Sequence, residues 1–473
     1  MKLSSTLLAE TKQRPSTAWL HPTRVILSAA LVAAAAVIVW IVPLRPTTSA
    51  FEQRELAKFP AFSWGALASG TYFDDISLWF SDTFPARETF VQMSSGIRGC
   101  FGLQGETIHG TVQEGDEIPD APTRPTATTT VATTTTTATV TTTTTATATT
   151  TTATPVTTTT VDTGTPTTTI DPSVLQQNQS LGAIIVKGDT AYEYYNFVRS
   201  TADQYIGILN RAGTKLDGVN VYSMIVPTSI DVMLEPDKRP ANSSDQGKAI
   251  AYMVGSLSEK VHPVEVRDSL LAHRSEYLYF HTDHHWTARG AYYAFAEFAQ
   301  LKGKTALPLS AFEEKAFHGF LGSFYAQTQN AGLKLGGDTV YAYKPQGNIS
   351  MVYGKTSSSA TVNYPVIADV TGWNPRYMYS TFIGGDNAYS CITNADITDG
   401  SSIVLVKESY GNAFAPYLAT MYHKVYVLDY RYFTEDFTAF VKNNGVQDVL
   451  LLNNISATRN KTLINKLDGF VGK

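Results

Sequence analysis

The sequence predicts an α/β protein: a three-layer domain with a mainly parallel sheet, preceded by one transmembrane helix. Three observations support this prediction. Short apolar segments alternate with helix-periodic segments from residue 173 to the end, a long apolar run lies near the N-terminus, and a threonine-rich tract separates two ordered parts. Apolar strands that alternate with helices are typical of a parallel sheet covered by helices on both faces.

The apolar run VILSAALVAAAAVIVWIVPL, residues 25–44, predicts a membrane anchor. It is uncharged and long enough to cross ~30 Å of hydrocarbon, whereas a secretory signal has an apolar core of only ~7–15 residues. TTSA just after the run resembles a weak cleavage site. Residues 1–24 contain four basic residues: Lys2, Lys12, Arg14 and Arg24. The positive-inside rule therefore predicts an uncleaved single-pass signal anchor in the cell membrane, with a cytoplasmic N-terminus and an extracellular C-terminal part.

Two segments follow the anchor. Residues 45–118 contain apolar residues at helical spacing, such as Ile76, Trp79 and Phe80, and we expect them to form the N-terminal part of the extracellular domain. Residues 119–172 are almost pure Thr, Ala, Val and Pro, a composition that cannot bury a core. We expect a disordered linker or insertion, either an O-glycosylated spacer or a repeat-expanded surface loop.

Residues 173–473 are expected to form the main extracellular domain. The expected strands are AIIV (183–186), VNVYSMIV (219–226), the start of VHPVEVRDSLLAH (261–273), SSIVLVK (401–407), KVYVLD (424–429) and DVLLLNN (448–454). The expected helices cover 200–216, 247–260, the end of 261–273, 291–303, 413–422 and 434–445. In a parallel sheet, sites form beyond the carboxyl ends of the strands.

Charge and cysteine content exclude some classes of function. The net charge of -5 and the isoelectric point near 6.0 argue against nucleic-acid binding, because no basic stripe is available to neutralise phosphates. The 25 tyrosines could offer stacking surfaces to sugars or could be ordinary half-buried residues. Cys100 and Cys391 show no metal-ligand spacing, and both a disulfide between them and two separate thiols remain open.

A serine follows the strand in SSIVLVKESYGNAFAPY. The strand ends at Lys407, and Glu408 and Ser409 lead into a turn and then a helix. A serine at such a turn projects from the carboxyl end of the sheet, where an acyl-transfer nucleophile needs to lie. The alternative is a simple helix cap.

The segment FHTDHHWT combines an aspartate with three histidines. Asp283 and His285 are two residues apart, so in an extended segment they point the same way while His284 points to the opposite side and is structural. A carboxylate can hold an imidazole in one tautomer, which leaves the other ring nitrogen free to take a proton from a serine. Thr287 is placed to cap the helix that follows.

Two other interpretations of this segment remain open. His281, Asp283 and His285 alternate on one face of an extended strand and are acceptable metal ligands, although no spacing such as H-E-x-x-H is present. The segment could also be only the polar start of a helix. Our prediction is that the site uses neither a metal nor an organic cofactor.

YLYFHTDHHWTARGAYYAF resembles the signature of the DHHW family, bacterial cell-envelope proteins named for that tetrapeptide. It is also similar to the Asp-x-His-Trp motif of the alginate O-acetyltransferase-like branch of SGNH hydrolases. LVKESYGNAFAPYLATMY resembles the family's serine block, usually Lys-Asp-Ser-Tyr, so Glu408 departs from the pattern, as does His281, where arginine is common. The resemblance covers residues 51–110 and 181 to the end, and it implies an SGNH-hydrolase-like fold.

The resemblance implies a catalytic triad of Ser409, His285 and Asp283. For the oxyanion, the sequence offers the amide of Ser409, Asn412 on the next turn, and Gly384 and Gly385 in IGGDN, each of which could also serve only its turn. The remaining substrate-binding candidates are Arg431 and Tyr432, which could contact an anionic sugar; pairing of Arg431 with Asp429 is the preferred interpretation.

The predicted function is an extracellular, membrane-anchored serine enzyme, an O-acetyltransferase or esterase acting on a cell-envelope glycan. By analogy with the alginate system, a membrane partner that exports the acyl group is expected. The alternative is a non-catalytic protein of the same fold that binds a glycan or helps to assemble the envelope.

Overall fold

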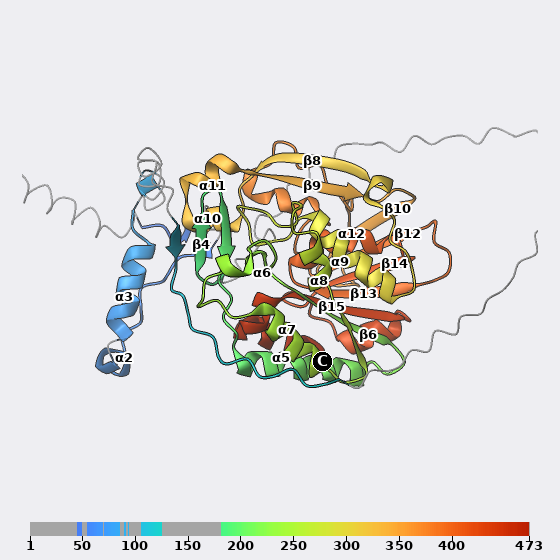
Figure 1. The fold of residues 1–473 in the computed structure, drawn as a ribbon, viewed down its shortest axis with the longest axis horizontal. Coiled ribbons are helices and arrows are strands. Elements are labelled where there is room, and N and C mark those ends of the chain that lie inside the picture. Colours follow the sequence, from blue (N-terminus) through green and yellow to red (C-terminus); the bar gives the residue numbers. More distant parts are fainter. Residues whose placement is uncertain are drawn as a thin grey trace, which may run out of the picture. The chain divides into compact units, whose positions relative to one another are not determined.

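The computed structural model of the protein describes residues 45–49, 54–69, 71–85, 89–90, 93, 106–124 and 181–472 (Figure 1). The predicted anchor at residues 25–44 lies outside these ranges. In the part of the chain that is described, no helix is both long and apolar enough to span a bilayer. The chain divides into two compact units, Met1–Leu103 and Gln104–Lys473.

The first unit contains short elements. Strands β1 (Thr48–Ser49) and β2 (Arg54–Glu55) pair antiparallel, and helices α2 (Trp64–Ser69) and α3 (Thr71–Asp82) follow. Helix α3 contains the apolar residues from which a helix was expected. Arg45 is buried here: its guanidinium lies 4.1 Å from the ring centre of Trp79 and donates a hydrogen bond to Thr83 Oγ1 at 2.8 Å.

The second unit is built on an eight-stranded sheet in the order β11-β10-β12-β14-β13-β15-β6-β7. The five strands from β14 to β7 are parallel, whereas β12, β10 and β11 are added antiparallel at one edge. The strands are β6 (Asn220–Val226), β7 (Val261–Val264), β10 (Ile349–Gly354), β11 (Val362–Asn363), β12 (Tyr389–Asn394), β13 (Ser402–Lys407), β14 (Lys424–Asp429) and β15 (Asp448–Asn454).

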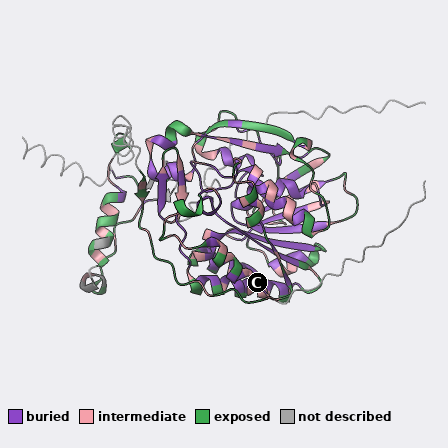
Figure 2. Ribbon diagram, viewed as in Figure 1, coloured by how far each residue is buried: buried purple, intermediate pink, exposed green. Residues whose placement is uncertain are grey.

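Helices cover both faces of this sheet, which makes three layers (Figure 1). Alternate residues of each parallel strand enter opposite cores: in β13, Ile403 and Leu405 pack in one, Val404 and Val406 in the other. The first core includes helices α6 (Ser229–Val232), α8 (Arg267–Ala272), α9 (Ala288–Leu301) and α12 (Tyr410–Leu418). The second includes α5 (Arg199–Lys215), α7 (Gln246–Gly255), α13 (Phe437–Asn443) and α14 (Lys461–Gly472). Figure 2 shows the sheet strands buried between helices whose outer faces are exposed. The predicted three-layer α/β architecture is confirmed.

Smaller elements surround the central sheet. A three-stranded sheet is formed by β3 (Thr107–His109), β4 (Ile184–Lys187) and β5 (Thr190–Glu193), and β8 (Glu313–Phe320) pairs with β9 (Asp338–Lys344) in a two-stranded ribbon. The remaining helices are α10 (Ser323–Thr328), α11 (Ala331–Gly336) and the 3₁₀ helices η3 (Pro236–Lys238), η4 (Leu309–Ala311), η5 (Pro375–Thr381) and η6 (Ile455–Arg459).

The central sheet is mainly parallel, as predicted, with an antiparallel edge formed by β12, β10 and β11. The structure differs from the sequence prediction in two ways. The strand expected at AIIV lies in the three-stranded sheet instead of the central one. The first residues of the predicted linker, 119–124, lie along the domain, where Arg124 donates hydrogen bonds to the carbonyls of Ser258 at 3.1 Å and Val261 at 2.7 Å. Residues 125–172 lie outside the described ranges. Of the two cysteines, Cys391 on β12 is a free thiol whose pKa is raised by burial, and Cys100 is outside the description.

Candidate active site

Ser409 lies at the carboxyl end of the central strand β13. Strand β13 ends at Lys407 and α12 begins at Tyr410, so the serine occupies the cap position of the helix. The turn is tight: a Cβ added at Gly411 would lie 2.4 Å from Cβ of Lys407, which explains why only glycine fits there. The serine is therefore held on a turn between two buried elements.

His285 reaches Ser409 from a loop 124 residues earlier in the chain. The loop is closed by a bridge between Tyr279 and Trp286, and Thr287 then caps α9 by accepting a hydrogen bond from the amide of Gly290 at 3.3 Å. Nε2 of His285 lies 2.7 Å from Oγ of Ser409, which is hydrogen-bonding distance. The sequence predicted that one imidazole would face this serine, and the structure brings the two together.

Asp283 orients His285. Its Oδ1 lies 2.5 Å from Nδ1 of His285 and accepts the backbone N–H of the same residue at 2.9 Å, and its Oδ2 accepts the amide of Ser323 at 2.7 Å. Burial alone would raise the pKa of Asp283, but the two neighbouring imidazoles and these hydrogen bonds lower its pKa well below the usual range. The carboxylate is therefore ionised and holds His285 in one orientation.

Two aromatic side chains fix the same arrangement. The ring of Tyr379, on η5, stacks on the imidazole of His285 with ring centres 4.0 Å apart and an interplanar angle of 12°. Its hydroxyl donates to the carbonyl of Ser409 at 3.1 Å. Trp286 donates from Nε1 to the carbonyl of Tyr410 at 3.0 Å. Trp286 thus joins the histidine loop to the serine turn directly, and Tyr379 contacts both of them.

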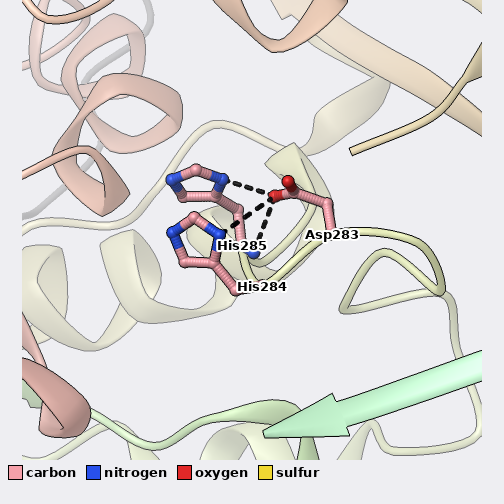
Figure 3. Close-up of side chains that lie close together, drawn as sticks. All are labelled: Asp283, His284 and His285. Carbon is pink, nitrogen blue, oxygen red and sulfur yellow. Dashed lines mark hydrogen bonds and ion pairs between the residues drawn. The ribbon is translucent and has the colours of Figure 1, made fainter. Parts of the chain in front are cut away.

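His284 does not turn away from Asp283, contrary to the prediction. The segment is bent rather than extended, so strand alternation does not apply to it. The rings of His284 and His285 lie side by side with centres 3.8 Å apart, and Nδ1 of His284 is 3.8 Å from Oδ1 of Asp283 (Figure 3). Nδ1 also lies 2.7 Å from Oγ of Ser323, and Nε2 is buried without a hydrogen-bond partner among the described residues. Burial, then repulsion from His285, lowers the pKa of His284 to about 4.

Glu408, where the family's serine block usually has aspartate, is fully buried beside the serine. Its Oε2 lies 3.2 Å from Ser409 Oγ and accepts the amide of Tyr410 at 3.1 Å, and its Oε1 accepts the amide of Asn454 at 2.9 Å. The longer side chain therefore ties the serine turn to the end of the neighbouring strand β15.

The predicted oxyanion donors have other partners in the structure. The side chain of Asn412 donates to Asp386 Oδ1 at 2.9 Å, and the amide of Gly385 donates to the carbonyl of Phe382 at 3.0 Å. Gly384 has φ +72°, and a Cβ added there would lie 3.1 Å from the ring of Tyr364. Gly384 and Gly385 thus form a turn, and the side chain of Asn412 binds a buried carboxylate instead of pointing to a free oxyanion position.

A buried ion network lies behind the serine turn. Lys407 Nζ lies 2.8 Å from Asp429 and 3.2 Å from Asp386, and Arg431 pairs with both carboxylates at 2.6 and 2.8 Å. The pairing of Arg431 with Asp429, the preferred interpretation of the sequence, is present. Tyr432 packs against this pair, with the Arg431 guanidinium 5.2 Å from its ring centre. Because both of these carboxylates already pair with the guanidinium of Arg431, this side chain is not available to bind a substrate.

The residues that could bind a metal in the structure differ from the set proposed from the sequence, which was His281, Asp283 and His285. The ligand-type atoms of Asp283, His284 and His285 lie within 4.8 Å of one another, and no fourth ligand-type residue joins this group in the described part of the chain. His281 is not a member. Because Asp283 Oδ1 and His285 Nδ1 already form a 2.5 Å hydrogen bond in a fully buried position, a metal would have to break that contact. The geometry fits a proton-transfer pair better than a metal site.

The model of the family described as "DHHW protein" matches residues 52–428 of this chain. The chain belongs to the DHHW family. A DHHW family protein from Eubacterium siraeum, known from a crystal structure, is 26% identical over 62% of this chain and 96% of its own, with a TM-score of 0.55. No curated protein matches the chain in sequence.

Two further solved structures match this DHHW protein, one of them closely enough to show a common fold. Bacillus cereus PatB1, captured with a sulfonyl adduct, is 17% identical over 59% of this chain and 97% of its own, with a TM-score of 0.50. The O-acetyltransferase domain of Pseudomonas putida AlgJ is 14% identical over 61% of this chain and 99% of its own, with a TM-score of 0.37. The likeness to PatB1 is one of fold, and the fold of the DHHW protein is α/β with a mixed, mostly parallel central sheet.

The sequence did not predict the roles of several residues of this site. No role in the site was predicted for Ser323, yet its amide donates a hydrogen bond to Asp283 and its hydroxyl contacts His284. The only local sign is the preceding Gly322, where a Cβ would lie 2.2 Å from Cβ of Asp283. Tyr379 and Asp386 come from segments with no strand or helix periodicity, so no spacing rule could place them beside Ser409.

Proposed function

We propose that this DHHW protein is a serine acyl-ester enzyme that moves an O-acetyl group to or from a glycan of the cell envelope. The observation that carries the proposal is the continuous hydrogen-bonded series from Asp283 Oδ1 through His285, at 2.5 Å, to Ser409 Oγ, at 2.7 Å. A nucleophile within ~2.6–3.2 Å of a base that a third group orients is the arrangement expected for covalent catalysis.

In the first half-reaction, Oγ of Ser409 attacks the carbonyl carbon of the acyl ester and its proton passes to Nε2 of His285. Asp283 stabilises the resulting imidazolium through the Nδ1–H hydrogen bond. The bond between the carbonyl carbon and the ester oxygen then breaks, and the leaving alkoxide takes the proton from Nε2. The product is an acyl ester on Ser409 with His285 neutral again.

In the second half-reaction, a sugar hydroxyl or water attacks the acylated serine. His285 takes the proton of the attacking group and returns it to Oγ of Ser409 as that oxygen leaves. Ser409 is 3% exposed and His285 is 1% exposed, which favours transfer to a bound hydroxyl over attack by bulk water.

We assign to His284 the stabilisation of the negatively charged oxygen of the tetrahedral intermediate. The backbone N–H of His284 donates to Ser323 Oγ at 3.2 Å, and among the described residues Nδ1 of His284, at 2.7 Å, is the acceptor for the hydroxyl proton of Ser323. That contact places the ring proton on Nε2. In Figure 3, Nε2 of His284 and Nε2 of His285 both point away from Asp283, to the same side. A neutral imidazole there would supply the N–H donor that Asn412 and Gly385 do not supply.

The location and the acyl donor are part of the proposal. With the predicted anchor at residues 25–44, the site would lie outside the cytoplasm, where activated acyl groups must be delivered. A membrane partner that exports them would meet this need, by analogy with the alginate system.

The experiment treats the full-length protein with p-nitrophenyl acetate and with a fluorophosphonate probe. Because PatB1 shares the fold and forms a sulfonyl adduct, a sulfonyl fluoride is a suitable second probe. We expect labelling and ester cleavage by the wild type and loss of both in Ser409→Ala. Ser390→Ala is the matched control, since Ser390 is also buried and its hydroxyl has no hydrogen-bond partner in the described part of the chain. Equal labelling of wild type and Ser409→Ala would favour a non-catalytic envelope protein.

A further inference from the structure

A cavity of about 370 Å³ lies between the three-stranded sheet and helix α10. At ~30 Å³ per water, this volume corresponds to about a dozen non-hydrogen atoms, the size of one pyranose ring with its hydroxyls. It also falls within the usual range of ligand pockets, ~300–1,000 Å³. Its polar lining consists of His109, Thr111, Gln113, Tyr194, Asn196, Gln327 and Arg459.

The cavity is adjacent to the site of Ser409, His285 and Asp283. Helix α10 begins at Ser323, which contacts both Asp283 and His284, and Gln327 lies one helical turn later, so ~6 Å of helix separates the two positions. Strand β5 contacts the same loop, where the amide of Ala191 donates to the carbonyl of His281 at 2.9 Å. Two separate elements therefore lead from the histidine loop to the cavity.

The lining is polar without a net charge. The guanidinium of Arg459 pairs with the buried carboxylate of Glu193 and donates to Asn196 Oδ1 at 2.9 Å, so its charge is neutralised within the protein. The side chains of Thr111, Gln113 and Gln327 are uncharged and contribute to the exposed part of the lining. Apolar contact comes from Leu181, Ala183 and Ile184. Amide and hydroxyl groups beside apolar surface match a sugar, whose hydroxyls and C–H faces alternate. His109 also lines the cavity, but the one permanent positive charge, on Arg459, is already paired and does not balance a carboxylate or phosphate of a ligand.

We propose that this cavity binds an uncharged sugar residue of the acceptor glycan. The proposal rests on the proposed function, and it adds the class of acceptor: a neutral, hydroxyl-rich sugar rather than a uronate or a phosphorylated polymer. A sugar held here would place the neighbouring part of its chain beside the histidine loop, where the acyl group is transferred.

The test is binding of two oligosaccharides of equal length to the full-length protein, measured by saturation-transfer NMR and calorimetry without an acyl donor. Cellohexaose is the neutral probe and hexagalacturonate the charged one. We expect binding of cellohexaose that falls at least fivefold in Gln327→Leu and in Gln113→Leu. Gln300→Leu is the matched control, because Gln300 is an exposed glutamine near the far end of α9. Its cellohexaose affinity should equal that of the wild type.

Three results would overturn the inference: no cellohexaose binding, binding that neither cavity variant weakens, or a preference for hexagalacturonate. The proposed function has a separate readout, the Ser409-dependent cleavage of p-nitrophenyl acetate. If the ester is cleaved but cellohexaose does not bind, the acceptor site alone is wrong. If cellohexaose binds through the cavity but Ser409 is inert, the site survives as a glycan-binding site and the enzymatic proposal fails.

Discussion

Tyr379 contacts both halves of the candidate active site: its ring lies 4.0 Å from the ring centre of His285, and its hydroxyl donates to the carbonyl of Ser409 at 3.1 Å. The ring restricts the imidazole to one plane, and the hydroxyl fixes the backbone of the serine turn. Because the two contacts use different parts of one side chain, substitution can separate them.

Tyr379→Phe keeps the stacked ring and removes the hydrogen bond, which costs about 1 kcal/mol of stability and should lower the turnover of p-nitrophenyl acetate only a few-fold. Tyr379→Ala removes the ring as well, and we expect it to cost ~3–5 kcal/mol of stability. Its turnover should fall far more than that of Tyr379→Phe, because the imidazole is free to rotate. Urea unfolding and steady-state kinetics measure the two effects. Equal activity of both variants, after correction for the folded fraction, would show that the stack does not position His285.

Asp283→Asn tests the role of the carboxylate at nearly constant volume. The amide can no longer stabilise the imidazolium, and it favours the wrong tautomer of His285. Loss of this function in a serine triad costs ~10⁴ in turnover. We expect a decrease of about that size in ester cleavage, with the circular dichroism spectrum unchanged. Turnover within tenfold of the wild type would mean that Asp283 only shapes the loop.

Much of the fold could be predicted because the central strands carry their own signal. Segments such as SSIVLVK and DVLLLNN are continuous apolar runs, and both became fully buried strands, β13 and β15. Strands β10 and β12 were missed, since their partly exposed residues give no such run. AIIV is different: it was expected as a strand and forms one, but it pairs in a small antiparallel sheet. Apolarity reveals that a strand is buried, but not which strand lies beside it.

The site was predictable where the chemistry depends on neighbouring residues. Asp283 and His285 are close in sequence, and Ser409 follows a buried strand, so local rules could propose all three. The direction of His284 was wrong because alternation holds only in extended backbone, and this loop is bent. Ser323 and Tyr379 depend on contacts between distant segments, which no spacing within one segment can reveal.

His284 should make stability depend on pH. Burial lowers the pKa of this imidazole to about 4, whereas in the unfolded chain it is about 6.5. Between these values the unfolded state binds more protons, so stability falls as the pH decreases from 7 to 5, by about 2 kcal/mol from this group. We expect the loss to be smaller in His284→Gln, and urea unfolding at pH 7, 6 and 5 measures it.

His318→Gln is the control for that experiment, because His318 lies on the exposed side of β8. Its stability should decrease with acidification as in the wild type. Parallel curves for wild type and His284→Gln would show that His284 titrates equally in the folded and unfolded states. The assignment of a neutral Nε2–H donor to the intermediate would then be lost as well.

Lys407→Met should disrupt the buried ion network behind the serine. Lys407 and Arg431 balance Asp386 and Asp429, and removal of one cation leaves an uncompensated buried carboxylate, which costs ~3–5 kcal/mol. Lys248→Met, at an exposed position of α7, should change stability by less than ~0.5 kcal/mol.

The double variant Lys407→Met, Asp386→Asn separates charge balance from packing. Neutralising Asp386 restores equal numbers of buried charges, so the double variant should lose less stability than the sum of the two single variants. Ester cleavage should recover only in part, because Asn412 on the serine turn also donates to Asp386 at 2.9 Å and that contact is weakened. If the two losses simply add, the network does not act as a charge-balanced unit, and Lys407 contributes through packing against Gly411 alone.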